Sequence, residues 1–100
     1  MWLANEVPKI LNSAAYKANG TLIITWDEGE NQSDGPIGLI VLSSNAKGGG
    51  YSNTLHYTHS STLRTVEELL GVTPLLGDAA NAKDLRDLFS SFPAATPQAP

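Results

Sequence analysis

Two short apolar runs constrain the fold of this 100-residue chain more than any other feature. Residues 21–26 and 37–43 are rich in β-branched residues and almost without polar interruption, which is typical of strands buried on both faces. The segment 27–36 between them is rich in Gly, Asn, Ser and Asp and predicts a loop. Because a parallel crossover needs about a dozen residues or more, we expect the second strand to lie antiparallel to the first or to neighbour it through an irregular loop. Two buried strands rarely stand alone, so we expect a larger sheet or a partner beside them.

Two longer segments predict helices. Residues 7–17 carry apolar residues on one face, with Pro8 in the first turn and Asn19-Gly20 as the stop. Residues 60–70 form the clearest amphipathic segment, with Ser60 or Ser61 as the candidate cap. Its expected apolar face and the glycine that ends it comprise Leu63, Val66, Leu69, Leu70 and Gly71.

The remaining segments carry weaker patterns. Residues 47–59 are rich in Gly, Ser and Asn and predict a long surface loop. Residues 82–89 predict a short helix. Residues 90–100 place prolines among Ala and Thr and predict a disordered tail, so the packed part of the chain is expected to end at residue 89.

The composition excludes several classes of function. The formal net charge is −4 without any Lys/Arg stripe, so nothing favours nucleic-acid binding. The chain has no cysteine, which excludes disulfides and thiolate metal sites within it. No apolar run approaches the ~20 residues that a transmembrane helix needs, and no signal-peptide pattern is visible at Met1 to Glu6.

The first apolar run ends abruptly in two adjacent carboxylates, Asp27 and Glu28. In open α/β sheets ligands bind beyond the carboxyl ends of strands, and hard oxygen donors suit a divalent cation. Glu30 and Asp34 add two acids, and no Lys or Arg lies nearby in the sequence to compensate them. The loop lacks the Gly and Glu that an EF-hand requires at its sixth and twelfth positions. A cation site and a solvated acidic loop are therefore the two interpretations.

Two histidines, His56 and His59, precede the clearest helix. An imidazole can ligate a metal, bond a phosphate oxygen or transfer a proton. His59 would also lie at a helix N-terminus, where an anion is favoured. Structural hydrogen bonds or helix capping are the alternative, and the two histidines taken alone favour it.

Other reactive side chains favour structural roles. No activating base accompanies the helical hydroxyls, so capping or surface positions are expected for Ser60, Ser61, Thr62 and Thr65. The Lys47-Gly48-Gly49-Gly50 stretch lacks the phosphate-loop pattern and predicts a flexible connector. Arg64 is expected to be a solvated helix residue, with an anion contact as the alternative. Core or rim packing is expected for Trp2, Trp26 and Tyr57.

In order and spacing, these motifs resemble a bacterial phosphoesterase family that includes acid phosphatases, phospholipases C and phosphatidylinositol-3-phosphatase-like members. The resemblance covers residues 2–89. It is carried by Trp2 with Val7-Pro8-Lys9-Ile10-Leu11, by residues 20–29, 40–43, 46–50 and 59–71, and by Leu76-Gly77-Asp78-Ala79-Ala80-Asn81-Ala82 with Asp87-Leu88-Phe89.

The resemblance implies both a fold and a chemistry. The implied fold class is α/β, with residues 1–89 as the C-terminal part of an alkaline-phosphatase-like α/β/α sandwich that contains two buried strands and about three helices. The implied activity is metal-dependent phosphoester hydrolysis through a phospho-enzyme. Asp27 and Glu28 align with paired ligands of a divalent cation (Ca²⁺, Mg²⁺ or Zn²⁺), and His59 aligns with a catalytic histidine beside the phosphate. The parent protein is expected to be extracellular or periplasmic.

Two departures from the family pattern define what the chain lacks. Many members have a His shortly after the Asp-Glu pair, whereas this chain has Asp34-Gly35-Pro36-Ile37. The family's Glu-Asn ligands and its hydroxyl nucleophile lie far upstream, and nothing in residues 1–100 matches them. The expected partners are therefore a phosphoester substrate and a missing N-terminal part of the same domain. The alternatives are a non-catalytic domain whose acidic loop binds Ca²⁺ or a protein partner, and an inactive truncated fragment.

Overall fold

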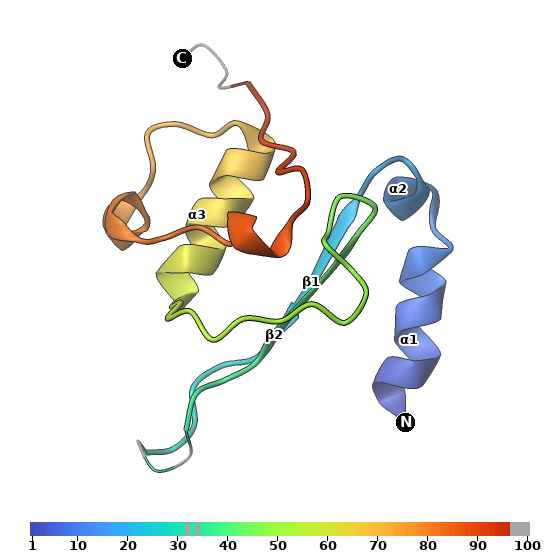
Figure 1. The fold of residues 1–100 in the computed structure, drawn as a ribbon, viewed down its shortest axis with the longest axis horizontal. Helices are drawn as coiled ribbons and strands as arrows, with labels where there is room; N and C mark the ends of the chain where they lie inside the picture. Colours follow the sequence, from blue (N-terminus) through green and yellow to red (C-terminus); the bar gives the residue numbers. More distant parts are fainter. Residues whose placement is uncertain (32, 34, 97–100) are drawn as a thin grey trace. The chain divides into compact units, whose positions relative to one another are not determined.

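The computed structural model describes residues 1–31, 33 and 35–96, and it divides into two compact units. The N-terminal unit is Met1–Ser44, and the C-terminal unit begins at Asn45. The elements in chain order are α1 (Trp2–Leu11), α2 (Ala14–Lys17), β1 (Thr21–Thr25), β2 (Leu39–Ser43), α3 (His59–Leu70) and the two 3₁₀ helices η2 (Gly77–Asn81) and η3 (Arg86–Leu88) (Figure 1). The chain is thus a mixed α/β protein, as predicted.

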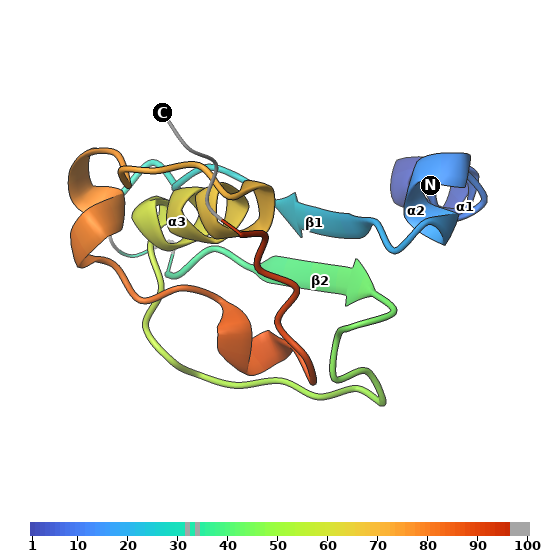
Figure 2. The same cartoon turned by 90° about the horizontal axis from the view of Figure 1, so that it is seen from above.

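The β structure of the N-terminal unit is a two-stranded antiparallel ladder. Strands β1 and β2 pair in the register that places Thr21 opposite Ser43 and Thr25 opposite Leu39. The antiparallel direction predicted from the short loop is confirmed. The two strands run side by side in both views (Figures 1 and 2).

The prediction that both strands are buried is wrong for this chain. Every residue of β1 is only half-buried, and Ile40 in β2 is 48% exposed. Each strand has a single hydrogen-bonded neighbour in the sheet of the described residues, so each keeps one open edge. Such a ladder lacks the adjoining strands and the second layer that bury a strand on both faces.

The predicted helix over residues 7–17 is two helices, and it begins earlier than predicted. Helix α1 starts at Trp2, so Pro8 lies inside it rather than in its first turn. The break between α1 and α2 follows from Ser13, whose hydroxyl donates to the Ile10 carbonyl at 2.6 Å and accepts from the Tyr16 amide at 3.2 Å. Ser13 is thereby the N-cap of α2, which interrupts one continuous helix.

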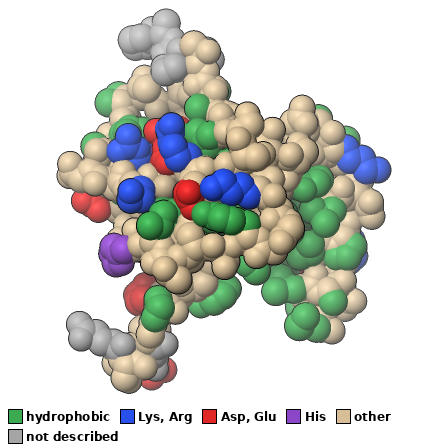
Figure 3. All heavy atoms as spheres, viewed as in Figure 1, with side chains coloured by type: hydrophobic (Ala, Val, Ile, Leu, Met, Phe, Trp, Pro, Cys, Tyr) green, Lys and Arg blue, Asp and Glu red, His purple; other side chains and the backbone are tan. Residues whose placement is uncertain are grey.

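The aromatic residues of the N-terminal unit are more exposed than predicted. Trp2 is 71% exposed and Trp26 is 55% exposed. No residue of α1 is buried, and hydrophobic side chains gather at the surface around this helix (Figure 3). Of the two expected positions, core or rim, the core is therefore wrong for both tryptophans, while Trp26 packs at the rim with its ring against Gly38.

Helix α3 of the C-terminal unit begins and ends at well-defined caps. Its N-cap is Thr58, and Ser61 completes a capping box by accepting the Thr58 amide at 3.0 Å. Ser60 and Ser61 were the predicted caps, so the prediction is wrong by two residues or more. The predicted C-terminal glycine cap is confirmed, because Gly71 has the left-handed φ of 68°.

The buried side of α3 is polar, which reverses the prediction from its apolar stripe. Leu63, Val66 and Leu70 are exposed. The buried residues of the helix are Ser61, Thr65 and Glu67. The predicted helix over residues 82–89 is also wrong: η2 precedes Ala82, and only Arg86–Leu88 within that range is helical.

Hydrogen bonds explain why the polar side of α3 faces inward. Thr65 Oγ1 accepts the Leu85 amide at 2.9 Å, and Glu67 accepts the Leu76 amide at 3.1 Å. Both connections tie α3 to the segments that carry η2 and η3. The apolar core beneath them consists of Ala79, Leu85 and Phe89.

The C-terminal tail makes contacts within the C-terminal unit over the residues that the structure describes. The described part of the tail, residues 90–96, includes Phe92 edge-to-face with Phe89 and an Ala95 amide that donates to the Glu68 carbonyl at 3.0 Å. Disorder of the tail stays a prediction, and residues 97–100 lie outside the described part.

Among the described helices, none has the length and apolar character to cross a membrane.

Candidate metal centre and its surroundings

The end of strand β1 packs closely against Gly38, the residue before β2. Thr25 Oγ1 donates to the Gly38 carbonyl at 2.9 Å. The next side chain, the Trp26 indole, lies so near Gly38 that a Cβ there would come within 2.5 Å of its ring. Only glycine admits this contact without a shift. The sequence therefore ends β1 at Thr25, one residue before the predicted end, and the acidic turn begins directly afterwards.

Asp27 and Glu28 follow on an exposed turn without regular structure. Asp27 Oδ1 accepts the backbone amide of Glu28 at 2.9 Å, which orients the Asp27 carboxylate along the turn. The predicted departure from strand geometry is confirmed, so alternation across a sheet no longer forces these two side chains to opposite sides. Glu30 is exposed farther along the turn, and Asp34 lies outside the described residues.

The chemistry of this acidic turn fits a hard divalent cation only in part. Two carboxylates on adjacent residues supply the oxygen donors that Ca²⁺ and Mg²⁺ prefer. Those ions take about six to eight ligands, so two side chains would need further donors. Asp27 and Glu28 therefore fit as two members of a larger ligand set.

The two histidines lie in the C-terminal unit. His59 is the first residue of α3 and is exposed, while His56 is exposed in the loop before it. The structure brings Asp27 and Glu28 together on one turn of the N-terminal unit. The convergence of His59 with these two acids stays a prediction.

Two of the hydroxyls considered as nucleophiles are structural. Thr65 is fully buried, donates to the Ser61 carbonyl at 2.8 Å and accepts the Leu85 amide. Ser61 is 2% exposed, and its hydroxyl belongs to the capping box. Neither hydroxyl is placed to attack a substrate. The capping role predicted for Ser61 is confirmed in the capping box, whereas the capping or surface position predicted for Thr65 is wrong, because Thr65 is fully buried.

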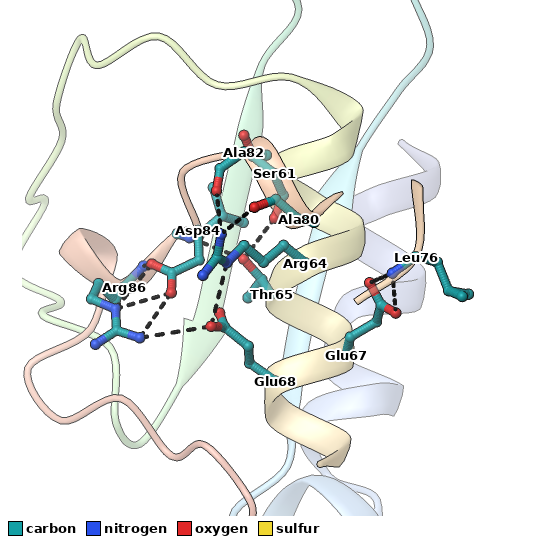
Figure 4. A network of polar contacts seen from close by, with 11 residues as sticks. Ser61, Arg64, Thr65, Glu67, Glu68, Leu76, Ala80, Ala82, Asp84 and Arg86 are labelled. Atoms are coloured by element: carbon teal, nitrogen blue, oxygen red, sulfur yellow. Dashed lines mark hydrogen bonds and ion pairs between the residues drawn. The ribbon is translucent and has the colours of Figure 1, made fainter. Parts of the chain in front are cut away.

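Arg64 is also structural, in contrast to the predicted solvated position. Its guanidinium donates to the Ala82 carbonyl at 2.9 Å and to the Ala80 carbonyl at 3.4 Å (Figure 4). Its Nε contacts Glu68 Oε2 at 3.4 Å. Arg64 thus holds η2 and the residue after it against α3.

Sequence reasoning missed Asp87, which anchors the long loop over residues 47–58. The Asp87 carboxylate accepts hydrogen bonds from Tyr51 Oη at 2.5 Å, Asn53 Nδ2 at 2.7 Å and Lys47 Nζ at 3.3 Å. The hydrogen bonds from Tyr51, Asn53 and Lys47 hold the pKa of Asp87 below its usual range. A lone acid in a predicted helix gave no signal of this role, because its partners lie at least 34 residues away.

The glycine-rich start of that loop, residues 48–50, forms a tight turn. Gly48, Gly49 and Gly50 all have positive φ, between 59° and 76°, a conformation that L side chains rarely adopt. The Tyr51 amide closes the turn onto the Gly48 carbonyl at 2.9 Å, and Lys47 Nζ lies 4.3 Å from the centre of the Tyr51 ring. This stretch therefore forms a hydrogen-bonded turn, and its flexibility stays a prediction.

Comparison with known proteins adds one significant similarity. The chain is 30% identical over 88 residues to a curated phosphatidylinositol-3-phosphatase of Mycobacterium tuberculosis. The matched stretch is 88% of this chain but 28% of the relative, so the chain spans less than a third of that protein. No family model matches the chain, and no solved structure matches it significantly. A stretch of 88 residues in a chain of 100 necessarily includes Asp27, Glu28 and His59, so all three candidate residues lie within the similarity to a phosphatase.

Proposed function

We propose that this chain is the C-terminal part of a metal-dependent phosphoester hydrolase of the phosphatase or phospholipase C type. The observation that carries the proposal is the similarity to a phosphatidylinositol-3-phosphatase over 88% of the chain, with the acidic turn and His59 inside it. The geometry of the turn supports it, because Asp27 and Glu28 present adjacent, exposed oxygen donors directly after a strand.

The architecture supports a larger parent domain. The β1–β2 ladder has an open edge on each strand and apolar residues at every central position of both strands. These features suit a pair of strands within a wider sheet. We propose that this sheet belongs to an alkaline-phosphatase-like sandwich whose other strands, upstream ligands and nucleophile come from the missing N-terminal part.

The proposed roles of the residues in this chain follow from their positions. Asp27 and Glu28 would hold a divalent cation (Ca²⁺, Mg²⁺ or Zn²⁺), which when bound stabilises charge on the phosphoryl oxygens. His59 lies in the first turn of α3, and from there it would orient a phosphate oxygen or hold a proton for it. The packing of Trp26 against Gly38 keeps the acidic turn at the end of the ladder.

Substitution of Asp27 in the full-length parent tests this function. Asp27→Asn is expected to lower both the content of bound metal and phosphoesterase activity, because it removes one anionic ligand of a site that needs several. Glu30→Gln is the matched control, since it removes one charge from the same exposed turn without touching the proposed ligands. Unchanged activity and metal content in Asp27→Asn would show that the acidic turn is not part of the active site.

A second candidate function is a non-catalytic cation-binding domain. It is favoured by the exposure of Asp27, Glu28 and Glu30 on one turn. Calorimetry of the 100-residue chain with Ca²⁺ and Mg²⁺ separates the two proposals. Tight, stoichiometric binding by this chain alone would favour the non-catalytic domain, because a partial ligand set for a larger enzyme is expected to bind weakly.

A further inference from the structure

Two carboxylates and two guanidiniums form a network on the inner side of α3 (Figure 4). Asp84 is 7% exposed, and its carboxylate accepts bonds from Arg86 Nε and Nη2 at 2.9–3.1 Å and from the Arg86 amide at 3.0 Å. Arg86 Nη2 also lies 3.9 Å from Glu68 Oε2, which contacts Arg64 Nε at 3.4 Å. The same Arg86 nitrogen therefore links the two carboxyl groups.

The second carboxyl oxygen of Glu68 lacks a hydrogen-bond donor in this network. Glu68 Oε1 is buried and has no hydrogen-bond partner among the described residues if the group is ionised. A hydrogen bond to the Asp84 carboxylate, which shares the contact with Arg86 Nη2, would give Glu68 Oε1 a partner. Two ionised carboxylates offer only acceptors, so such a bond requires a proton on one of them. A buried acceptor that stays unpaired lowers the stability of the folded state.

We propose that Glu68 is a neutral acid that donates its proton to Asp84, and that loss of this proton loosens the C-terminal unit as the pH rises. Asp84 is the partner that stays ionised, because Arg86 offers three donors to its carboxylate, namely the backbone amide, Nε and Nη2. The neutral Glu68 gives Oε1 the partner that it otherwise lacks. The pair is thus a pH-sensitive connection between α3 and the segment before η3.

The surrounding groups act in the direction this assignment needs. Burial raises the pKa of Glu68, and Asp84 raises it further, against the opposing effect of Arg64. Burial also acts to raise the pKa of Asp84, but the hydrogen bonds from Arg86 and Glu68 outweigh it and leave that pKa lowered. Arg64 from α3 and Arg86 from η3 are the charged groups that face the pair.

The sign of the pH dependence follows from these directions. Because the pKa of Glu68 is raised on folding, its stabilising contribution is complete below the ordinary value of about 4.3 and is lost as the pH rises through the folded pKa. The pKa of Asp84 is lowered, so its contribution is complete above about 3.9 and is lost as the pH falls through the folded pKa. The network is therefore most favourable in mildly acidic solution.

Carboxyl-detected NMR of the 100-residue chain from about pH 3 to about pH 9 tests the proposal, together with urea unfolding at each pH. Glu68 is expected to titrate above about 4.3, and the unfolding constant is expected to rise above that pH. The rise is tenfold for each pKa unit that separates folded from unfolded Glu68. A Glu68 that titrates at or below the ordinary value would overturn the proposal, because Arg64 and Arg86 would then keep both acids ionised.

Glu68→Gln provides a second, independent test. Glutamine keeps a neutral donor toward Asp84, so this variant is expected to lose the alkaline rise in the unfolding constant. Glu6→Gln is the matched control: it makes the same charge change in α1 of the other unit and is expected to keep the wild-type pH profile. Retention of the full alkaline rise in Glu68→Gln would contradict the proposal. If that variant does not fold, the wild-type titration of Glu68 decides alone.

Discussion

The hydroxyl of Thr65 is expected to be a principal stabilising group of the C-terminal unit. The side chain is fully buried, and its oxygen accepts the amide of Leu85, which is itself 0% exposed. Thr65→Val keeps the shape of the side chain but removes this acceptor, so the buried Leu85 amide loses its hydrogen-bond partner. We expect the variant to lose about 2 kcal/mol of stability, since an orphaned buried donor costs about 1–3 kcal/mol. The Ser61 carbonyl, which also loses a partner in the hydroxyl, keeps its place in the helix hydrogen-bond ladder.

Urea unfolding followed by circular dichroism measures this loss as a lower midpoint with an unchanged m-value. Thr65→Ser is the matched control, because it keeps the hydroxyl and removes one methyl group at a cost of about 1 kcal/mol. Hydrogen exchange of the Leu85 amide separates the two effects. This amide is expected to exchange faster in Thr65→Val than global unfolding explains, and to remain protected in Thr65→Ser. Stability of Thr65→Val within about 0.5 kcal/mol of wild type, the usual range for surface substitutions, would refute the reasoning.

Three further predictions concern backbone and loop positions. Gly71→Ala is expected to lower the free energy of unfolding by about 1–2 kcal/mol, because φ is 68° there and the new Cβ would meet the Thr96 carbonyl at 2.7 Å; an unchanged urea midpoint would contradict it. Gly38→Ala is expected to push the Trp26 indole outward, because the new Cβ would lie 2.5 Å from the ring. The change is measured as a red shift of tryptophan emission in a Trp2→Phe background, and an unshifted spectrum would contradict the prediction. Asp87→Ala is expected to speed hydrogen exchange in the 47–58 loop. In the wild type the same faster exchange is expected as the pH falls through the lowered pKa of Asp87. Equal exchange rates of the loop amides in the wild type and in Asp87→Ala would show that Asp87 does not anchor the loop.

The sequence by itself determined the features that depend on neighbouring residues. The apolar run over 21–26 and the short loop after it were enough to predict β1 to within one residue and to favour an antiparallel partner, because a loop of that length is short for a parallel crossover. Gly71 was predictable as a cap, because few other residues adopt a left-handed conformation readily. The exposed turn at Asp27 and Glu28 was predictable for the same local reason, since polar residues follow directly after an apolar strand.

Tertiary structure alone decided which side of α3 is buried. Its apolar stripe predicts that Leu63 and Val66 face inward, yet the structure buries Thr65 and Glu67. The reason is that these polar side chains bond amides 20 and 9 residues away in the chain. A periodicity argument registers hydrophobicity along one helix and cannot see such partners.

The candidate site also contains one part that local sequence could predict and one part that it could not. The acidic turn depends on residues adjacent in sequence, so its local geometry could be predicted. The anchoring of the loop by Asp87 and the proposed Glu68–Asp84 pair depend on contacts between distant segments, and the predicted place of His59 near the acidic turn would depend on such contacts too. Local sequence fixes the backbone within a few residues, whereas burial and hydrogen bonding between distant segments determine which polar groups meet and which of them keeps a proton.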